Sequence, residues 1–547
     1  MNFRWAWRAS ALGSGRRSVT RRRNGFRPAL DGSRPLEERV LAAVDVLTYH
    51  NDLARTGQNL AETQLTATTV SAATFGKVGQ VKVDGQVYAQ PLVKTGVDVP
   101  GKGVRDLVFV ATEHDSVYAF DANTLEPIWH VSFIDPSRGI TTVPMEDLQD
   151  HSLNPEAGIT STPVIDPATG TIYVVSRIKI TQGNSASYEQ HLHALDVATG
   201  AEKFGGPTRI AATVKGKGID SKKGFVSFDP LRENNRPGLL LLNGVVYAAF
   251  ASIGDIQPYH GWLLGFDAQS LRLVTAFNTT PNGSEGGIWM SGGAPAVDAA
   301  GNIYLSVGNG TFSRGTNPTD LGSAVIKLST RNNPLKAVDY FVPYNYRALN
   351  RADVDLGSGG IVLLPNLRKT DQPLLVTGGK MKGLFVLNRA KLGGFNAGGD
   401  QVYQFLRKGV HGIFSSPAYF NGKVYVVGAA PIPGIRQSLR SFAVTNNRLS
   451  ATPKEGIPTY GWPGASPSIS ASGRSNGIVW TIDRGNDRNG ILRAYDSEDV
   501  TRQLYDSTES GGRDTGSGFV KFSTPTIANG RVFVGGSSAL TVYGLLG

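Results

Sequence analysis

The stretch Val108-Phe-Val-Ala-Thr-Glu-His-Asp-Ser-Val-Tyr-Ala-Phe-Asp-Ala-Asn-Thr-Leu-Glu-Pro-Ile-Trp129 contains two apolar segments separated by a short polar turn. Residues 108–111 and 117–120 are rich in valine and aromatic residues, which favour strands. Apolar residues at adjacent positions indicate strands that are buried on both faces. Asp121 is expected to close the next turn through its own backbone. The stretch therefore predicts two neighbouring strands of a small antiparallel sheet.

This unit repeats along the chain from residue 75 onward. A strand led by proline recurs at Pro91, Pro163, Pro237, Pro295, Pro417, Pro467 and Pro525. The interval of 122 residues between Pro295 and Pro417 is long enough for two units, and residues 359–361 are the expected start of the missing one. Seven intervals over 434 residues give a mean unit of about 62 residues. The sequence therefore predicts eight similar units, which is typical of a repeat architecture.

The two ends of the repeat predict how the fold closes. Sheets of about four strands bury both faces most economically when they stack radially as a β-propeller. The last unit, residues 524–547, has room for only three strands, and residues 75–83 form an unassigned strand ahead of the first unit. Pairing the two would remove both open edges. We therefore expect an all-β fold: an eight-bladed β-propeller of four-stranded antiparallel blades, closed by an N-terminal strand in the last blade.

Composition excludes several classes of protein. The 547 residues include no cysteine, so disulfides, thiolate metal sites, iron–sulfur clusters and covalent haem attachment through cysteine are excluded. No run approaches the roughly 20 apolar residues of a bilayer-spanning helix, so we expect no transmembrane segment. Phosphate-binding loops and the common hydrolase and metalloprotease motifs are also missing from the sequence.

The net charge of +11 is concentrated at the start of the chain. Residues 1–40 hold ten arginines and three acids, a net charge of +7, so the other 507 residues carry only +4. A nearly neutral body argues against a nucleic-acid partner. We expect residues 1–45 to be a basic leader, either a disordered or misassigned start or a degenerate export signal, because no apolar stretch follows the paired arginines. Residues 46–547 would then form a single propeller domain, periplasmic or extracellular if the leader directs export.

The unit seen most clearly in residues 108–129 resembles the pyrroloquinoline quinone (PQQ)-like repeat of quinoprotein alcohol dehydrogenases and of their non-catalytic relatives. The resemblance covers about residues 75–547. In the dehydrogenases it implies PQQ over the propeller axis, Ca²⁺ between the quinone and the protein, and an aspartate as base. The cation would polarise the reactive carbonyl, and the carboxylate would take the alcohol proton.

The resemblance implies site residues in the middle of the chain. Asn309, in the turn after the strand of Tyr304, matches the family's calcium-ligand asparagine. Asp353-Val-Asp355 matches an Asp-x-Asp motif one blade later, with Asp355 as base and Asp353 as ligand or second carboxylate. Each also has a structural alternative. Asn309 between two glycines suits a hairpin turn, and the aspartates could form a turn or pair with nearby arginines, Arg347 and Arg351.

Two further residues match the family less closely. Trp289 is the candidate for the tryptophan beneath the quinone ring, with the alternative that it fills space between blades. Glu189 could be the calcium-ligand glutamate of the second blade only if a loop is shortened. The family's adjacent cysteine pair, which covers the quinone in many of these dehydrogenases, does not exist in this sequence.

Two histidine features are independent of the resemblance. His191-Leu-His193 places both imidazoles on one face of a strand, as two metal ligands would require, but no third ligand is evident nearby. Residues 113–115, Glu-His-Asp, lie between two strands of the first blade, and we expect a solvated hairpin tip.

Two functions of different classes follow from these observations. The leading interpretation is an exported propeller that acts as a binding or scaffolding module, with an unknown protein or small-molecule ligand at the propeller axis, because fold alone does not establish function. The alternative is a quinoprotein oxidoreductase that uses PQQ and Ca²⁺ on an alcohol or sugar. It would employ Asn309, Asp353, Asp355, Trp289 and Glu189 as described.

Overall fold

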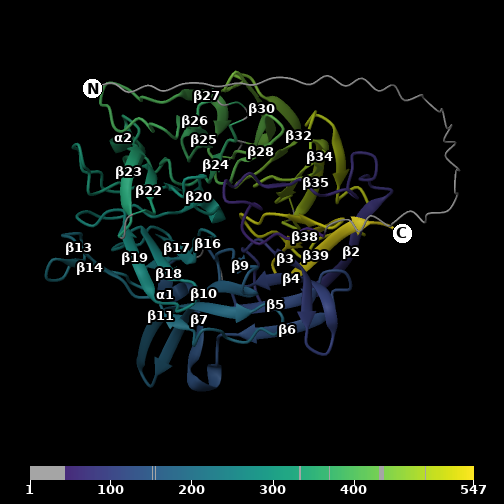
Figure 1. The fold of residues 1–547 in the computed structure, drawn as a ribbon, viewed down its shortest axis with the longest axis horizontal. Helices are drawn as coiled ribbons and strands as arrows, with labels where there is room; N and C mark the ends of the chain where they lie inside the picture. Colours follow the sequence, from purple (N-terminus) through teal and green to yellow (C-terminus); the bar gives the residue numbers. More distant parts are fainter. Residues whose placement is uncertain are drawn as a thin grey trace, which may run out of the picture. The chain divides into compact units, whose positions relative to one another are not determined.

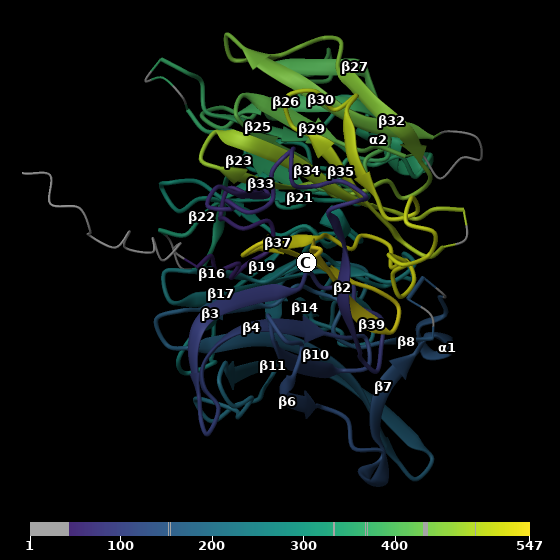
Figure 2. The ribbon, with the colours of Figure 1, turned by 90° about the vertical axis from the view of Figure 1, so that its right-hand side faces the viewer.

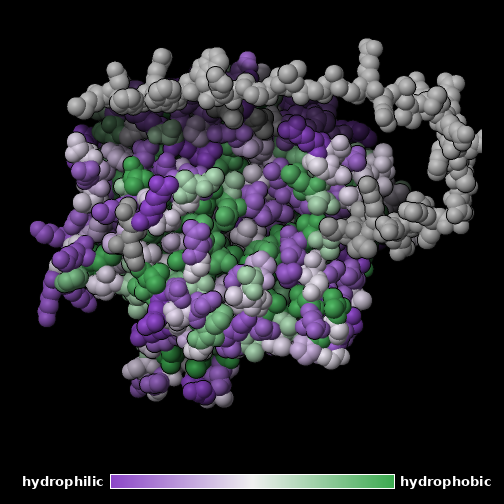
Figure 3. Space-filling view, viewed as in Figure 1, coloured by the Kyte–Doolittle hydropathy of each residue, from purple (hydrophilic) through white to green (hydrophobic). Residues whose placement is uncertain are grey.

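Strands make up most of the structure, a computed structural model that describes residues 43–547 except 151, 154, 332, 333, 367, 369, 430–435 and 487. Nearly all of the expected basic leader lies outside the described residues. Within them, no helix is long and apolar enough to cross a bilayer. Hydrophobic and hydrophilic residues are interspersed over the face of the molecule shown in Figure 3.

Eight four-stranded antiparallel sheets form a β-propeller, as predicted. The first four blades contain β3 (Leu92–Val99), β4 (Gly103–Ala111), β5 (Ser116–Asp121) and β6 (Pro127–Ser132); β9 (Val164–Asp166), β10 (Thr171–Gln182), β11 (Ser185–Asp196) and β12 (Thr208–Arg209); β16 (Leu240–Leu242), β17 (Val245–Ser252), β18 (Trp262–Asp267) and β19 (Leu273–Asn278); and β20 (Ala296–Val297), β21 (Ile303–Ser306), β22 (Val325–Ser329) and β23 (Lys336–Phe341).

The other four blades complete the ring. They contain β24 (Ile361–Leu363), β25 (Leu374–Thr377), β26 (Lys382–Asn388) and β27 (Gln404–His411); β28 (Ala418–Phe420), β29 (Lys423–Val426), β30 (Gln437–Thr445) and β32 (Lys454–Tyr460); β33 (Ser468–Ser472), β34 (Ser475–Asp483), β35 (Ile491–Asp496) and β36 (Gln503–Asp506); and β37 (Thr526–Ala528), β38 (Arg531–Gly535), β39 (Ala539–Leu545) and β2 (Phe75–Lys82).

Short elements lie between or beside the blades. They are β1 (Gln58–Asn59), β7 (Ile140–Pro144), β8 (Glu156–Ala157), β13 (Thr213–Lys215), β14 (Phe225–Ser227), β15 (Glu233–Asn234), β31 (Arg448–Leu449), α1 (Met145–Leu148) and α2 (Tyr346–Arg351).

The first strand of each blade lies nearest the propeller axis. In Figure 1 the sheets follow one another around the ring in chain order. The first strands contact each other: β9 contacts β16, β20 contacts β24, and β33 contacts both β28 and β37. The hydroxyl of Thr526, which begins β37, donates to the carbonyl of Pro91 at 2.6 Å and links the eighth blade to the first. Segments that enter the first strands therefore meet at the axis.

Residues 75–82 close the ring, as predicted. β2 pairs antiparallel with β39, from Phe75 opposite Leu545 to Lys82 opposite Ala539, and Figure 2 shows the purple β2 against the yellow β39. The ring of Phe75 packs against Trp480 of the seventh blade, with centroids 5.3 Å apart. The N-terminal strand thus completes the eighth sheet and also contributes to the core between two blades.

A segment with two turns, which the repeat pattern did not predict, follows the inner strands. Residues 46–59, called here the inner segment, form backbone hydrogen bonds of 2.7–3.0 Å with the first strands of six blades and a side-chain bond to a seventh. Its partners are Val93, Ile165, Val297, Leu363, Tyr419, Ile469 and Ile527. The inner segment therefore joins blades that do not touch each other directly.

Arg55 anchors the inner segment. Its side chain is 1% exposed, and its Nε donates to the carbonyl of Pro295 at 2.9 Å. Its Nη1 donates to Thr48 Oγ1 and the Tyr49 carbonyl, both at 2.8 Å. Buried carbonyls without a donor are costly, so one side chain stabilises the fourth blade and the turn of the segment together.

We expect Arg55→Met to lower the free energy of unfolding by about 3 kcal/mol, because it leaves several buried acceptors unpaired while conserving most of the side-chain volume. Urea denaturation followed by tryptophan fluorescence measures this change. Lys82→Met, at an exposed position of β2, is the matched control and should change stability by less than about 0.5 kcal/mol. Equal stability of the two variants would contradict the anchoring role.

Candidate functional site

A cavity of about 240 Å³, called here the axial chamber, opens where the segments that enter the first strands converge. Seven blades contribute to its wall. The lining residues are Ser152, Arg236, Gly254, Asp255, Trp289, Ser291, Asp355, Ser358, Lys380, Phe414, Trp462, Lys521 and Phe522. Most precede the first strand of their blade by a few residues, so the repeat itself brings them together.

The backbone after Trp289 is held in an unusual conformation that directs the indole into the axial chamber. Met290 and Ser291 both have φ of 47°, in the left-handed region that residues with a side chain rarely adopt. Gly308 lies against the indole, because a Cβ atom at that position would be 2.7 Å from Trp289 Cδ1 and 2.9 Å from Asp355 Oδ2. The glycine of the Gly-Asn turn therefore lets the tryptophan and the aspartate pack side by side.

Arg236 adds a cation to this aromatic surface. Its Cζ lies 5.9 Å from the centre of the Trp289 ring and 4.4 Å from that of Phe522. Burial lowers the pKa of its guanidinium, although the group keeps its positive charge at neutral pH. The chamber therefore has aromatic faces with a cation between them, which suits a flat and negatively charged molecule.

Asn309, Asp353, Lys380 and Asp355 form one polar cluster. Asn309 Nδ2 donates to Asp353 Oδ1 at 2.7 Å. The Lys380 ammonium pairs with Asp353 and lies 3.1 Å from Asp355 Oδ1. The Oδ1 atom of Asn309 is buried and has no hydrogen-bond partner among the described residues. Two carboxylates, one amide oxygen and one ammonium thus converge beside Trp289.

The two aspartates differ in their environment. The side chain of Asp355 is 2% exposed, whereas that of Asp353 is 62% exposed. Burial raises the pKa of Asp355, while the neighbouring Lys380 opposes the rise. A carboxylate with a raised pKa accepts protons more readily when ionised. Asp355 is therefore the better general base of the pair.

Comparison with solved structures reveals the same propeller in redox enzymes. The chain superposes on a quinohemoprotein alcohol dehydrogenase from Comamonas testosteroni with a TM-score of 0.59 at 15% identity, covering 91% of this chain and 80% of that one. The Pseudomonas putida HK5 enzyme of the same name gives 0.58 at 13% identity over 92% and 80%. A europium-containing methanol dehydrogenase gives 0.56 at 12% identity over 92% and 98%.

The chain has the quinoprotein alcohol dehydrogenase fold. No family model matches its sequence, and no curated protein matches it by sequence. Identities of 12–15% establish the fold alone. The chemistry of the axial chamber must therefore be argued from the side chains that line it.

The axial chamber lies beside four of the five candidate residues from the sequence. Trp289 and Asp355 line it, and Asn309 and Asp353 adjoin it through Lys380. The structural alternatives have different outcomes. Asn309 is not in a tight hairpin, because residues 307–324 separate β21 from β22. Asp353 does lie in a turn, with a φ of 51°, but its carboxylate pairs with Lys380 and not with the nearby arginines.

Glu189 and the histidine pair lie elsewhere. Glu189 is in β11, and its carboxylate pairs with His191 at 3.1 Å and with Arg209 of the outer strand β12 at 3.3 Å. His193 bonds Glu202 and Ser176 through its two ring nitrogens. In the described part of the chain, no group of three or more His, Asp or Glu side chains could hold a metal ion. Glu189 is therefore not brought to the chamber.

The expectation of a solvated tip at residues 113–115 is wrong. Glu113 is 1% exposed and Asp115 is fully buried. Glu113 Oε2 accepts bonds from the Gly158 amide at 2.9 Å and the Thr160 hydroxyl at 3.1 Å, while Oε1 has no partner among the described residues. The turn faces the axis, where the segment around Gly158 covers it. Burial raises the pKa of Glu113 to about 7, although hydrogen bonds to Gly158 and Thr160 oppose the rise.

Sequence reasoning missed the cations of the chamber. Arg236, Lys380 and Lys521 stand alone in their segments and match no motif. Their position relative to the strands is the signal that could have identified them as residues of the chamber. Arg236 and Lys521 precede the first strand of a blade, and Lys380 follows the second strand, as Asn309 does one blade earlier.

Glu113 should make the stability of the protein depend on pH. Its pKa is raised in the folded state, so the folded protein binds the proton more tightly than the unfolded chain. The contribution of this group to the free energy of unfolding is fully present below about pH 4.5 and is lost as the pH rises to about 7. We expect Glu113→Gln to remove this loss and to be more stable than the wild type at pH 8 by about 3 kcal/mol.

Urea denaturation of both proteins at pH 5 and pH 8 measures the difference. Glu126→Gln, which changes a surface carboxylate of the same blade that is 58% exposed, is the control and should follow the wild type. If Glu113→Gln loses as much stability between the two pH values as the wild type does, the carboxyl is not the group responsible.

Proposed function

We propose that the axial chamber binds PQQ together with Ca²⁺ and that the protein oxidises an alcohol or sugar. One observation carries the proposal. Four residues match quinoprotein positions in the sequence: Trp289 and Asp355 line the axial chamber, and Asn309 and Asp353 adjoin it through Lys380.

The chamber fits the chemical character of the quinone. PQQ is planar and carries several carboxylates. Trp289 offers a flat apolar face, and Trp462 and Phe522, with ring centroids 6.4 Å apart, extend the aromatic wall. Arg236, Lys380 and Lys521 supply positive charge in a partly desolvated space, where ionic interactions are stronger than in water.

The polar cluster supplies the oxygen donors that calcium prefers. Asn309 Oδ1 is buried and unpartnered, and the carboxylates of Asp353 and Asp355 are linked to it through hydrogen bonds and Lys380. Calcium takes about six to eight oxygen ligands. Asn309 and Asp353 would hold the ion on one side, and the quinone and water would supply the other ligands.

The chain's own residues would handle the proton. When bound, PQQ supplies a two-electron acceptor for the carbon-bound hydrogen of the alcohol. Asp355, ionised and buried, takes the hydroxyl proton, and Lys380 stabilises the ionised carboxylate before the proton moves. Because burial raises the pKa of Asp355, activity should fall on acidification at a higher pH than an ordinary aspartate would give.

The location of the candidate residues at a cavity is the reason to prefer this function over a binding or scaffolding role. Protein partners usually dock on exposed surface patches, whereas the polar cluster and Trp289 face a cavity of a size suited to a small molecule. Export of the protein to the periplasm or beyond stays a prediction.

Retention of the quinone is the direct test. Purified protein is incubated with PQQ and Ca²⁺, passed through a desalting column, and its absorbance spectrum is recorded. We expect retained quinone and dye-linked oxidation of alcohols or sugars, with retention lost on chelation of calcium. Asn309→Ala should weaken calcium-dependent retention about tenfold or more. Absence of any retained chromophore would leave the binding or scaffolding role as the better interpretation.

Asp355→Asn separates the base from the binding residues. We expect this variant to retain quinone but to lose about 100-fold or more in kcat, because the amide cannot accept the proton. The wild type should lose kcat as the pH falls through the pKa of Asp355, and Asp98→Asn, at an exposed position of β3, should behave like the wild type. Unchanged kcat in Asp355→Asn would show that another group is the base.

A further inference from the structure

A second and larger cavity adjoins the axial chamber. This outer chamber has a volume of about 750 Å³ and is lined by Gln86, Tyr88, Ser152, Trp462, Arg484, Arg488, Phe519, Val520 and Lys521. Ser152, Trp462 and Lys521 belong to the walls of both cavities. A molecule in the outer chamber can therefore reach the axial chamber along Lys521.

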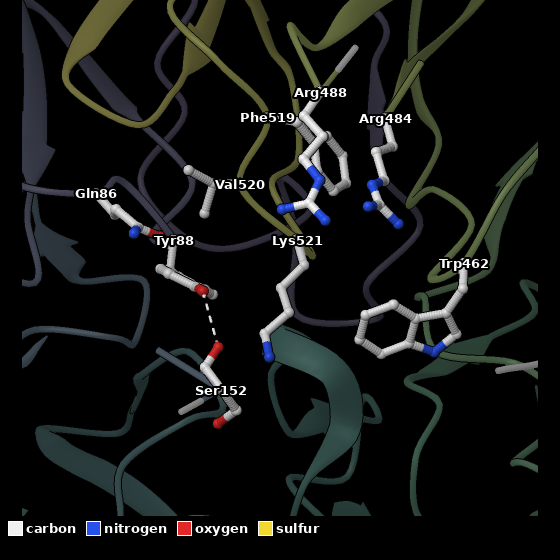
Figure 4. Close-up of a pocket in the computed structure, with 9 residues that line it drawn as sticks. All are labelled: Gln86, Tyr88, Ser152, Trp462, Arg484, Arg488, Phe519, Val520 and Lys521. Atoms are coloured by element: carbon white, nitrogen blue, oxygen red, sulfur yellow. Dashed lines mark hydrogen bonds between the residues drawn. The ribbon is translucent and has the colours of Figure 1, made fainter. Parts of the chain in front are cut away.

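Three cations point into the outer chamber. Figure 4 shows Arg484, Arg488 and Lys521 extending into the same space, between Trp462 on one side and Tyr88 with Ser152 on the other. Arg484 and Arg488 come from the loop between β34 and β35, and Lys521 comes from the segment before β37. Two blades thus supply positive charge to one cavity.

Within the part of the chain that the structure describes, these charges have no ionic partner. None of the nine lining residues is acidic. Among the residues that the structure describes, which do not include Asp487, neither arginine forms an ion pair or a side-chain hydrogen bond. Lys521 also lacks an ion pair within that part of the chain, and its Nζ lies 5.8 Å from the Trp462 ring and 5.7 Å from the Phe522 ring. The carboxylates that act electrostatically on Lys521 are Asp150 and Glu113, and neither of them lines the cavity.

Desolvation makes the charge of Lys521 sensitive to what occupies the cavity. Burial lowers its pKa to about 7, and the like charge of Arg236 acts in the same direction. An anion in the cavity would offset both effects, because a nearby negative charge favours the ammonium form. A cluster of cations that lines one cavity, with no acidic residue among its described lining residues, is typical of a site that is completed by an anionic ligand.

We propose that the outer chamber binds the oxyanion group of the substrate, so that the alcohol or sugar oxidised beside the axial chamber carries a carboxylate or a phosphate. The anion site stands on Arg484, Arg488 and Lys521; its assignment to the substrate rests on the proposed function. Guanidinium groups match carboxylate and phosphate oxygens with paired hydrogen bonds. Tyr88, Trp462 and Phe519 provide flat faces for the carbon skeleton of a sugar.

The first experiment measures anion binding without the quinone. Isothermal titration of the purified protein uses gluconate and sorbitol 6-phosphate, with sorbitol as the uncharged compound of similar size. We expect both anions to bind at least tenfold more tightly than sorbitol, and their relative affinities to distinguish a carboxylate site from a phosphate site. Equal affinity for gluconate, sorbitol 6-phosphate and sorbitol would overturn the proposal.

Variants locate the site. Arg484→Gln and Arg488→Gln should each weaken anion binding about tenfold and leave sorbitol unaffected. The matched control is Arg474→Gln, which removes the same charge from the β33–β34 turn at the opposite end of the same blade. Anion binding that falls equally in all three variants, or in none, would show that these arginines are not the site. Circular dichroism and thermal melting confirm that each variant is folded.

Competition separates this inference from the proposed function. With saturating PQQ present, gluconate should still bind, and kcat/KM for gluconate should exceed that for sorbitol by about tenfold in the wild type but not in Arg484→Gln. Displacement of gluconate by PQQ would mean that the arginines hold the quinone's own carboxylates, and would overturn the inference. Failure of PQQ to bind at all would refute the cofactor, while the titration would still decide whether the outer chamber is an anion site.

Discussion

The structure depends on keeping eight inner strands side by side around one axis. Each blade is a small twisted sheet that cannot bury both faces alone, so its stability comes from its neighbours. The ring has two closures that are separate in the chain. β2 supplies the missing strand of the eighth blade, and the inner segment forms backbone bonds with first strands around most of the ring. The second closure uses backbone groups, which pair regardless of the side chains that the repeat carries.

This constraint also determines where chemistry can occur. Because every first strand begins near the axis, the residues that precede it are crowded together and screened from water. The pKa values of ionisable groups there are therefore shifted from the values that the same groups have on a surface. Burial raises the pKa of Glu113 to about 7 and lowers that of Lys521 to about 7, although the two groups belong to the first and the eighth blade. The unusual backbone at Met290 and Ser291 occurs in the same crowded layer.

The sequence could predict the features that recur. Pro-led starts appear seven times and apolar second strands eight times, so the blade number and the pairing of β2 with β39 could be predicted from the pattern alone. The inner segment occurs once, has no apolar periodicity, and is held mainly by its backbone. The burial of Glu113 could not be predicted from the sequence, because a polar triplet between two strands is typical of an exposed turn. Only the close approach of Gly158, where a Cβ atom would lie 2.3 Å from the Glu113 carbonyl oxygen, reveals that the turn is covered.

The two chambers differ in charge in a way that bears on what each can do. In the axial chamber Lys380 is matched by Asp353 and Asp355, so the cluster can hold or release a proton without leaving a large net charge. In the outer chamber the cations have no such counterpart among the lining residues, which favours binding over proton transfer. Most blades contribute a few side chains to this region, and nearly all of these lie in the segments between the strands. The same fold is therefore compatible with sequences that are only 12–15% identical, and the function of this chain depends on the side chains near its axis.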